Sequence, residues 1–149
     1  MTGLGSLSAR EVARLLDLAP HPEGGHYRET FRDTAAGPDG RPASTAILYL
    51  LAGDEVSDWH RVDAAEVWHY HAGAPMVITL SPNGHDAAAR HLGPDIRAGQ
   101  SPQIVVPAGC WQTAASLGAW TLVGCTVAPG FRFEGFEMAP PGWRPTPRG

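Results

Sequence analysis

Glycine and proline interrupt this chain too often for long helices, since 18 Gly and 14 Pro are spread through its 149 residues. Proline lacks the amide hydrogen that helices and central strands require, and glycine favours turns. The segments between them are short and rich in β-branched and aromatic residues, a composition typical of strands. The sequence therefore predicts a chain of many short strands.

Seven segments are long enough to be predicted as strands. They are His26–Phe31, Ser44–Leu51, Glu66–His71, Pro75–Ser81, Ala88–Leu92, Gln103–Val106 and Trp120–Ala128. Asn83-Gly84 separates two of them and is typical of a tight hairpin turn. Many short antiparallel strands separated by turns favour a sandwich or a closed barrel over an alternating α/β fold.

One helix is predicted at the start of the chain. Ser8 and Glu11 have the spacing of a capping box, and apolar residues at helical spacing follow them. Pro20 cannot continue a helix, so we expect the helix to cover about residues 8–18. At the other end, residues 139–149 are rich in proline and are expected to form a loosely ordered tail.

Length and charge exclude several classes of protein. The length predicts a single domain over residues 1–149. Eleven basic residues against fifteen acidic ones give a net charge of −4, which argues against a nucleic-acid partner. Two cysteines do not form a disulfide framework. The chain contains no apolar run long enough for a signal peptide or a membrane span, so we expect a cytoplasmic protein without a membrane partner.

Polar and aromatic side chains are densest between residues 57 and 73. Strand alternation places Glu66, Trp68 and Tyr70 on one face of the predicted strand. A carboxylate on a face with two large aromatic residues is expected inside the fold, where it must be paired, bound to metal or protonated. The nearest partner along the chain is His60. We therefore expect His60 and Glu66 to form the centre of a site.

Two motifs resemble those of the cupin superfamily. His60-x-Val62-x3-Glu66-x6-Gly73 is similar to the first cupin motif, and Pro107-x-Gly109-x2-Gln112 is similar to the second. Over residues 10–138 the chain also resembles the uncharacterised cupin subfamily DUF985, or cupin_5. The segments that carry this resemblance are Pro22–Gly25, Tyr27–Thr30, Ser44–Ile47, Trp59–Arg61, Glu66–Gly73, Val106–Gln112 and Val127–Phe131.

The resemblance implies a fold and a kind of site. The fold would be an all-β cupin double-stranded β-helix, a jelly-roll barrel, with one short N-terminal helix. Such barrels hold a small-molecule ligand in an internal pocket and are usually homodimers, so we expect both here. The subfamily supplies no established reaction, and whether the chain is an enzyme stays open.

The chain departs from the metal-binding cupins at two ligand positions. Those cupins hold a divalent metal with three His and one Glu, but here Val62 and Gln112 occupy two of the His positions. His60, Glu66 and Gln112 remain as candidate ligands of a divalent transition metal. Glutamine is a weak neutral oxygen ligand, so this site would be weak. A metal-dependent dioxygenase or lyase is therefore kept as an alternative.

The second hypothesis needs no metal. A carboxylate beside a histidine fixes the imidazole tautomer and raises its pKa toward neutrality, which suits a general base. Cupins of the sugar-nucleotide epimerase type are similar in using a His base without metal. The sequence thus favours an isomerase or epimerase of a polar or sugar-like metabolite, with His60 as base and Glu66 and Tyr70 as further catalytic residues.

Further residues are candidates for ligand contacts. Aromatic rings would stack on a ring ligand, amides would read hydroxyls, and an arginine would hold a carboxylate or phosphate. The candidates are Tyr49, Arg61, Trp68, Gln103, Trp111 and Gln112. Each also has a purely structural interpretation, and a non-catalytic ligand-binding cupin remains a third hypothesis. His69 and His71 share the opposite strand face, where a two-His metal site and a plain surface pair are both open.

Overall fold

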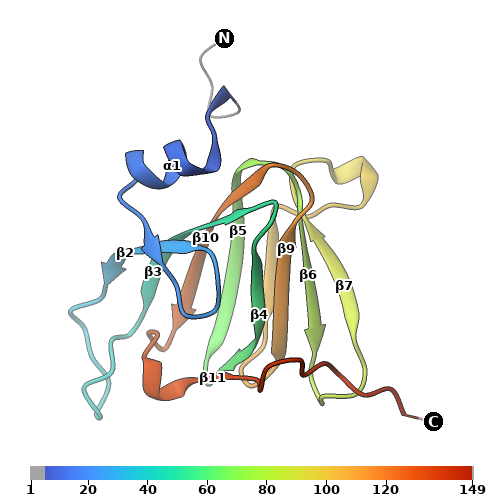
Figure 1. The fold of residues 1–149 in the computed structure, drawn as a ribbon. Helices are drawn as coiled ribbons and strands as arrows, with labels where there is room; N and C mark the ends of the chain where they lie inside the picture. Colours follow the sequence, from blue (N-terminus) through green and yellow to red (C-terminus); the bar gives the residue numbers. More distant parts are fainter. Residues whose placement is uncertain (1–5, 149) are drawn as a thin grey trace.

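A computed structural model describes residues 6–148 of the chain. Within these residues two antiparallel sheets face each other, and one α-helix lies outside them (Figure 1). This architecture confirms the expected all-β jelly roll with a short N-terminal helix. No helix among the described residues is both long and apolar enough to cross a membrane.

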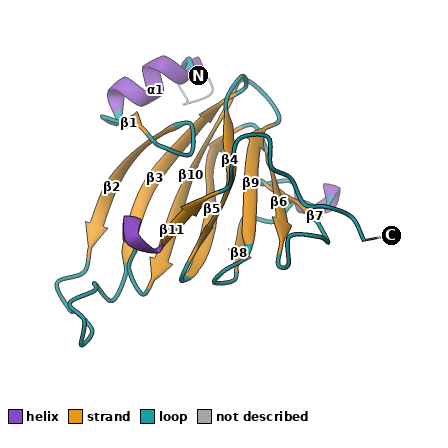
Figure 2. Cartoon of the chain, turned by 60° about the horizontal axis from the view of Figure 1, so that its bottom comes forward, coloured by secondary structure: helices purple, strands orange, loops and turns teal. Residues whose placement is uncertain are grey.

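The larger sheet contains six strands of the described chain, in the order β1, β2, β3, β10, β5 and β8. Their bounds are β1 (Ala19–Pro20), β2 (His26–Arg32), β3 (Thr45–Ala52), β10 (Trp120–Ala128), β5 (Ala65–Gly73) and β8 (Gln103–Val106). Strand β10 lies between β3 and β5 and is antiparallel to both. A strand from late in the chain therefore joins two strands from its first half (Figure 2).

The smaller sheet contains five strands among residues 6–148, in the order β11, β4, β9, β6 and β7. Their bounds are β11 (Phe136–Met138), β4 (Val56–Val62), β9 (Trp111–Ser116), β6 (Met76–Ser81) and β7 (Ala88–Leu92). The hairpin predicted at Asn83-Gly84 is confirmed, since β6 pairs with β7. Strands β4 and β9, which carry His60 and Gln112, were not among the predicted strands. Short 3₁₀ turns η2 (Ile96–Ala98) and η3 (Phe133–Gly135) precede β8 and β11.

Helix α1 (Ala9–Leu15) covers part of the outer face of the larger sheet. The predicted capping box is confirmed, with the Glu11 amide donating to Ser8 Oγ (3.2 Å) and the Ser8 amide donating to Glu11 Oε1 (3.0 Å). The helix ends earlier than predicted because Asp17 adopts a left-handed conformation with φ of 57°. Its Val12 packs against an apolar patch that includes Leu50.

The core lies between the two sheets and fills only one end of the sandwich. Tyr49, Leu51, Trp68 and Ile78 are almost fully buried there. The opposite end is where β3 begins and β10 ends, because Val127 pairs with the first residues of β3. That end is not filled by side chains and contains the cavity described below.

The proline-rich tail differs from the loosely ordered segment that we expected. The Ala139 amide donates to the Trp59 carbonyl (2.9 Å), and the Thr146 amide donates to the Gly84 carbonyl (2.9 Å). Trp143 packs against Trp111, with 4.7 Å between ring centroids. Aromatic contacts and backbone hydrogen bonds thus hold the tail against the outer face of the smaller sheet. The proline-rich composition of the tail does not predict these contacts.

Candidate functional site

A cavity of about 720 Å³ lies between the sheets at the end where β3 begins. This volume is in the range of pockets that hold small metabolites. Thr45 and Ile47 on β3 and Cys125 and Val127 on β10 form one wall. Alternation along the strands explains this, because residues two apart point to the same side of a sheet.

His60 reaches the cavity from β4 and is 1% exposed. Its Nδ1 lies 2.7 Å from the carbonyl oxygen of Asp58. Because a carbonyl oxygen only accepts hydrogen bonds, Nδ1 carries the hydrogen and the neutral ring has its lone pair on Nε2. The Nε2 atom lies 3.7 Å from Glu23 Oε2, beyond hydrogen-bonding distance. The ring is therefore oriented as a proton acceptor.

Glu23 comes from the turn between β1 and β2 and lies between two histidines. Its carboxylate accepts a hydrogen bond from the Ser57 hydroxyl. Its backbone amide donates to His21 Nδ1 (3.0 Å), so that nitrogen is unprotonated. The 3.4 Å approach of Glu23 Oε1 to the same nitrogen is therefore not an ion pair. Burial lowers the pKa of His21, which agrees with a neutral ring.

Glu66 extends from the start of β5 into the cavity and is 8% exposed. Burial, together with the negative charge of Glu23, raises the pKa of Glu66 to about 7. The side-chain amide of Gln112 donates to Glu66 Oε1 (2.8 Å) and lowers that pKa only in part. Glu66 is thus able to gain and lose a proton near neutral pH, as a catalytic acid must.

Trp68 fixes the orientation of Gln112. The indole nitrogen only donates, and it donates to Gln112 Oε1 (2.9 Å). The amide nitrogen of Gln112 must then face Glu66, and its oxygen is already occupied. Both side chains lie behind the cavity wall, fully buried, and support Glu66 instead of contacting a ligand.

This orientation does not fit the predicted metal site of His60, Glu66 and Gln112. A metal shared with Glu66 would need the Gln112 oxygen on the side of Glu66, but the amide nitrogen faces Glu66 and the oxygen faces Trp68. Among residues 6–148, no three His, Cys, Asp or Glu side chains are grouped closely enough to hold a metal ion. The donor set that the family's metal enzymes use is therefore not assembled by these residues.

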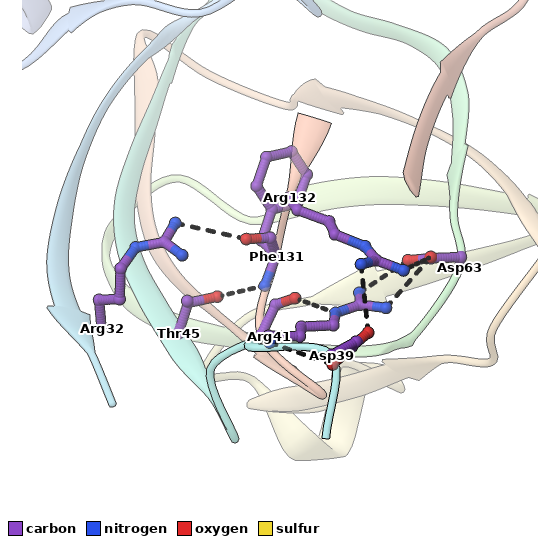
Figure 3. Close-up of polar contacts among 8 residues, drawn as sticks. Arg32, Asp39, Arg41, Thr45, Asp63, Phe131 and Arg132 are labelled. Carbon is purple, nitrogen blue, oxygen red and sulfur yellow. Dashed lines mark hydrogen bonds and ion pairs between the residues drawn. The ribbon is translucent and has the colours of Figure 1, made fainter. Parts of the chain in front are cut away.

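The exposed and half-buried residues that border the cavity form its rim. Two of them are bound as a pair on β2, where Arg32 Nε and Nη2 each donate to the Glu29 carboxylate at 2.8 Å. A bulge in β2 brings these two residues to the same face. On the opposite side, Arg132 lies 3.3 Å from Asp39 and 3.7 Å from Asp63 (Figure 3).

Aromatic rings complete the walls. Tyr27 from β2 and Phe131 and Phe133 from the segment after β10 line the cavity. The His21 ring packs edge-on against Tyr27, with 4.4 Å between centroids. The cavity thus combines an inner end of His21, Glu23, His60 and Glu66 with aromatic walls and a charged rim.

Several predicted site residues lie elsewhere. Tyr70 faces the core, and its hydroxyl donates to the Gly73 carbonyl (2.6 Å), away from the cavity. Tyr49 is buried beside the inner end and donates to the Gly24 carbonyl. Arg61 stacks over Trp111 at 4.5 Å on the outer face of the smaller sheet.

Gln103, His69 and His71 lie on the other face of β5 or beside it. Gln103 Nε2 lies 3.1 Å from His69 Nδ1, and His69 Nε2 lies 2.9 Å from the Thr126 hydroxyl. Both ring nitrogens of His69 therefore have partners. These residues are outside the cavity and are not part of the candidate site.

Sequence reasoning did not assign His21 and Glu23 to the site. They lie in a turn, almost forty residues before His60, and no local pattern connects them with it. The available signal was the segment Pro22–Gly25, which carries part of the family resemblance but has no chemical role of its own in the cupin motifs. Only the fold brings it against Ser57 and His60.

Comparisons with known proteins agree with this architecture. The family model Cupin_5, described as cupin superfamily (DUF985), matches residues 10–139. A structural-genomics protein from Shewanella oneidensis is 38% identical, with a TM-score of 0.85 over 89% of this chain and 85% of that one. A hypothetical protein from Leishmania major is 28% identical, with a TM-score of 0.80 over 89% and 88%.

Oxalate decarboxylase from Bacillus subtilis is similar in fold alone. It is 14% identical, with a TM-score of 0.62 over 83% of this chain and 30% of that one. No curated protein matches the sequence.

Proposed function

We propose a function for this chain as a member of the Cupin_5 (DUF985) family of the cupin superfamily. The match over residues 10–139 shows that the chain belongs to this family. The protein is proposed to be a metal-independent isomerase or epimerase of a small polar metabolite. His60 would act as the base and Glu66 as its acid partner. The substrate would bind in the cavity between the sheets.

The orientation of His60 carries this proposal. Its Nδ1 is held by the Asp58 carbonyl, so Nε2 offers a lone pair at the inner end of the cavity. A buried imidazole fixed in one tautomer, with its free nitrogen toward a ligand-sized space, suits proton abstraction. A structural histidine would be expected to satisfy both nitrogens.

The proposed step conserves atoms and electrons. His60 Nε2 removes a proton from the carbon beside a carbonyl group, and the C–H electrons form the carbon–carbon double bond of an enediol. Protonated Glu66, which a pKa of about 7 keeps available, gives its proton to the carbonyl oxygen. For isomerisation, His60 gives its proton to the former carbonyl carbon while Glu66 takes the proton of the hydroxyl on the adjacent carbon, where the new carbonyl forms. For epimerisation, the enediol turns its other face to His60, which returns the proton to the same carbon while Glu66 takes back the proton from the enediol oxygen.

Deuterium exchange tests the proposal even while the substrate is unidentified. The protein is incubated in D₂O with aldoses, ketoses and 2-hydroxy ketones, and mass spectrometry measures deuterium at the carbon beside the carbonyl. We expect exchange into at least one compound. The variant His60→Gln should lower its rate by about 10²–10⁴-fold, the usual contribution of a general base. Glu66→Gln should lower it as well.

A histidine outside the cavity provides the control. His91 is exposed on β7, and His91→Gln should leave both folding and exchange unchanged. Exchange that persists in a folded His60→Gln variant would contradict the proposal. Compounds that stabilise the wild type without exchange would instead support the non-catalytic ligand-binding alternative.

A further inference from the structure

Two of the three arginines that line the cavity are paired with carboxylates within the fold. Arg32 donates from one edge, Nε and Nη2, to the Glu29 carboxylate, and Arg132 lies against Asp39 and Asp63 (Figure 3). The third, Arg28, donates from Nε to the Leu16 carbonyl (2.9 Å). Within residues 6–148, both Nη groups of Arg28 are therefore free, and the buried Nε of Arg132 has no hydrogen-bond partner, but among the arginines that line the cavity only Arg28 lacks a carboxylate partner.

Five carboxylate side chains line the cavity, against three arginines. Asp17 and Glu134 are exposed at the rim, and within residues 6–148 neither carboxylate has a hydrogen bond or an ion pair. At the inner end, Glu23 and Glu66 are both more than nine-tenths buried. Carboxyl groups thus lie at both ends of the same cavity.

Two further observations indicate what would occupy this space. His60 Nε2 is aimed into the cavity from a side chain that is 2% exposed, and among the described residues nothing donates a hydrogen bond to it. It therefore awaits a donor from a ligand. Tyr27, Phe131 and Phe133 supply aromatic rings, whose faces attract cations.

We propose that the ligand of this cavity carries a protonated amine and that the cavity discriminates against anions of the same shape. The Glu23 carboxylate and the aromatic walls would hold the ammonium group, and Asp17 and Glu134 would attract it at the entrance, while Glu66 keeps its role as the acid. The inference rests on the proposed function in that the same cavity binds the substrate. It adds the charge class of that substrate.

Matched triplets of compounds test the charge class, because each triplet keeps one carbon framework and changes the charge of a single end group. The first triplet is sorbitol, glucamine and gluconate, and the second is benzyl alcohol, benzylamine and benzoate. Calorimetry measures the Kd of each compound at low salt and again at high salt. We expect the amine of at least one triplet to bind at least about tenfold more tightly than its carboxylate, with the ratio falling as salt rises.

The rim carboxylates provide a variant that leaves the proposed catalytic groups intact. Asp17→Asn/Glu134→Gln should reduce the amine-to-carboxylate ratio several-fold without loss of folding. The control Asp54→Asn/Asp86→Asn removes the same charge from exposed positions that do not line the cavity, and it should leave the ratio unchanged.

Two outcomes would overturn the inference. One is a carboxylate that binds as tightly as its amine in both triplets, and the other is no binding of either amine at about 10 mM. Neither outcome bears on the deuterium-exchange experiment with neutral ketoses, because that exchange depends on His60 and Glu66. Failure of the charge preference and failure of the proposed reaction are therefore distinguishable.

Discussion

Glu66 has a pKa well above the ordinary value of a glutamate side chain in water. Its carboxyl group is buried beside Glu23, and both effects favour the neutral acid. Gln112, held by Trp68, supplies one hydrogen bond in partial compensation. The residue is therefore costly to the fold when ionised, and this cost is measurable.

The variant Glu66→Gln should remove that cost. With a pKa of about 7 in the folded state and 4.5 as the ordinary value, the native protein binds more protons than the unfolded chain between these values. The wild type should therefore lose stability as pH rises from about 4.5 to 7. Relative to the wild type, the variant should gain roughly 3 kcal/mol over this interval. Urea unfolding of both proteins at pH 5 and pH 8 measures this difference.

A stability difference between the two proteins that does not change with pH would contradict the raised pKa of Glu66. The pH dependence contributed by groups that do not interact with Glu66 cancels in the comparison.

Residue by residue, the sequence predicted the centre of the site better than its surroundings. His60 and Glu66 were predicted together, and both line the cavity. Tyr70 was placed on the correct face of β5, but it points toward the filled end of the sandwich. Strand alternation determines a side of the sheet and gives no information on the distance along it.

At the scale of elements, the turn between β1 and β2 is the least regular part of the site. It carries His21 and Glu23, and two glycines with positive φ follow directly. A Cβ on Gly24, whose φ is 108°, would overlap the carbonyl oxygen of Val56 on β4. The close approach of this turn to β4 is what brings Glu23 to Ser57 and His60.

Gly24→Ala should therefore damage both stability and the site. The variant needs a left-handed backbone and must also move β4 or the turn, so we expect a loss of more than about 3 kcal/mol. Gly40→Ala is the matched control, because Gly40 also has a positive φ of 78° but nothing lies within 4 Å of its added Cβ. It should cost about 1–2 kcal/mol. Urea unfolding compares the two, and equal losses would show that the close approach is unimportant.

The elements also show where local pattern stops being informative. The strands rich in β-branched residues and the β6–β7 hairpin were predicted within a residue or two. Strands β4 and β9 were missed because polar and aromatic residues interrupt their alternation. The turn that holds Glu23 could not be assigned to the site because its contacts join segments far apart in the sequence.

At the scale of the whole molecule, the tail contributes to stability through one aromatic side chain. Trp143 lies between Trp111 and Trp59, with centroid distances of 4.7 Å and 5.5 Å. Arg61 stacks on the Trp111 ring and forms an ion pair with Glu137 at 2.8 Å. This cluster covers part of the outer face of the smaller sheet.

Trp143→Ala should lower the free energy of unfolding by about 2 kcal/mol, since the ring is half-buried and packs against aromatic partners. Trp143→Phe should retain more than half of this stability. Unfolding monitored by circular dichroism gives both values, and limited proteolysis should cut the tail faster in the alanine variant. No change in either measurement would show that the tail contributes nothing.

The central position of β10 has a consequence for the order in which the protein is made. During synthesis the strands on either side of it, β3 and β5, emerge long before residue 120. Until β10 is inserted, the larger sheet exists as two unjoined parts, and the cavity lacks the wall of Cys125 and Val127. Ligand binding by ribosome-bound chains should therefore begin only once this strand has left the exit tunnel. The nascent chain therefore spends most of its translation without a complete cavity.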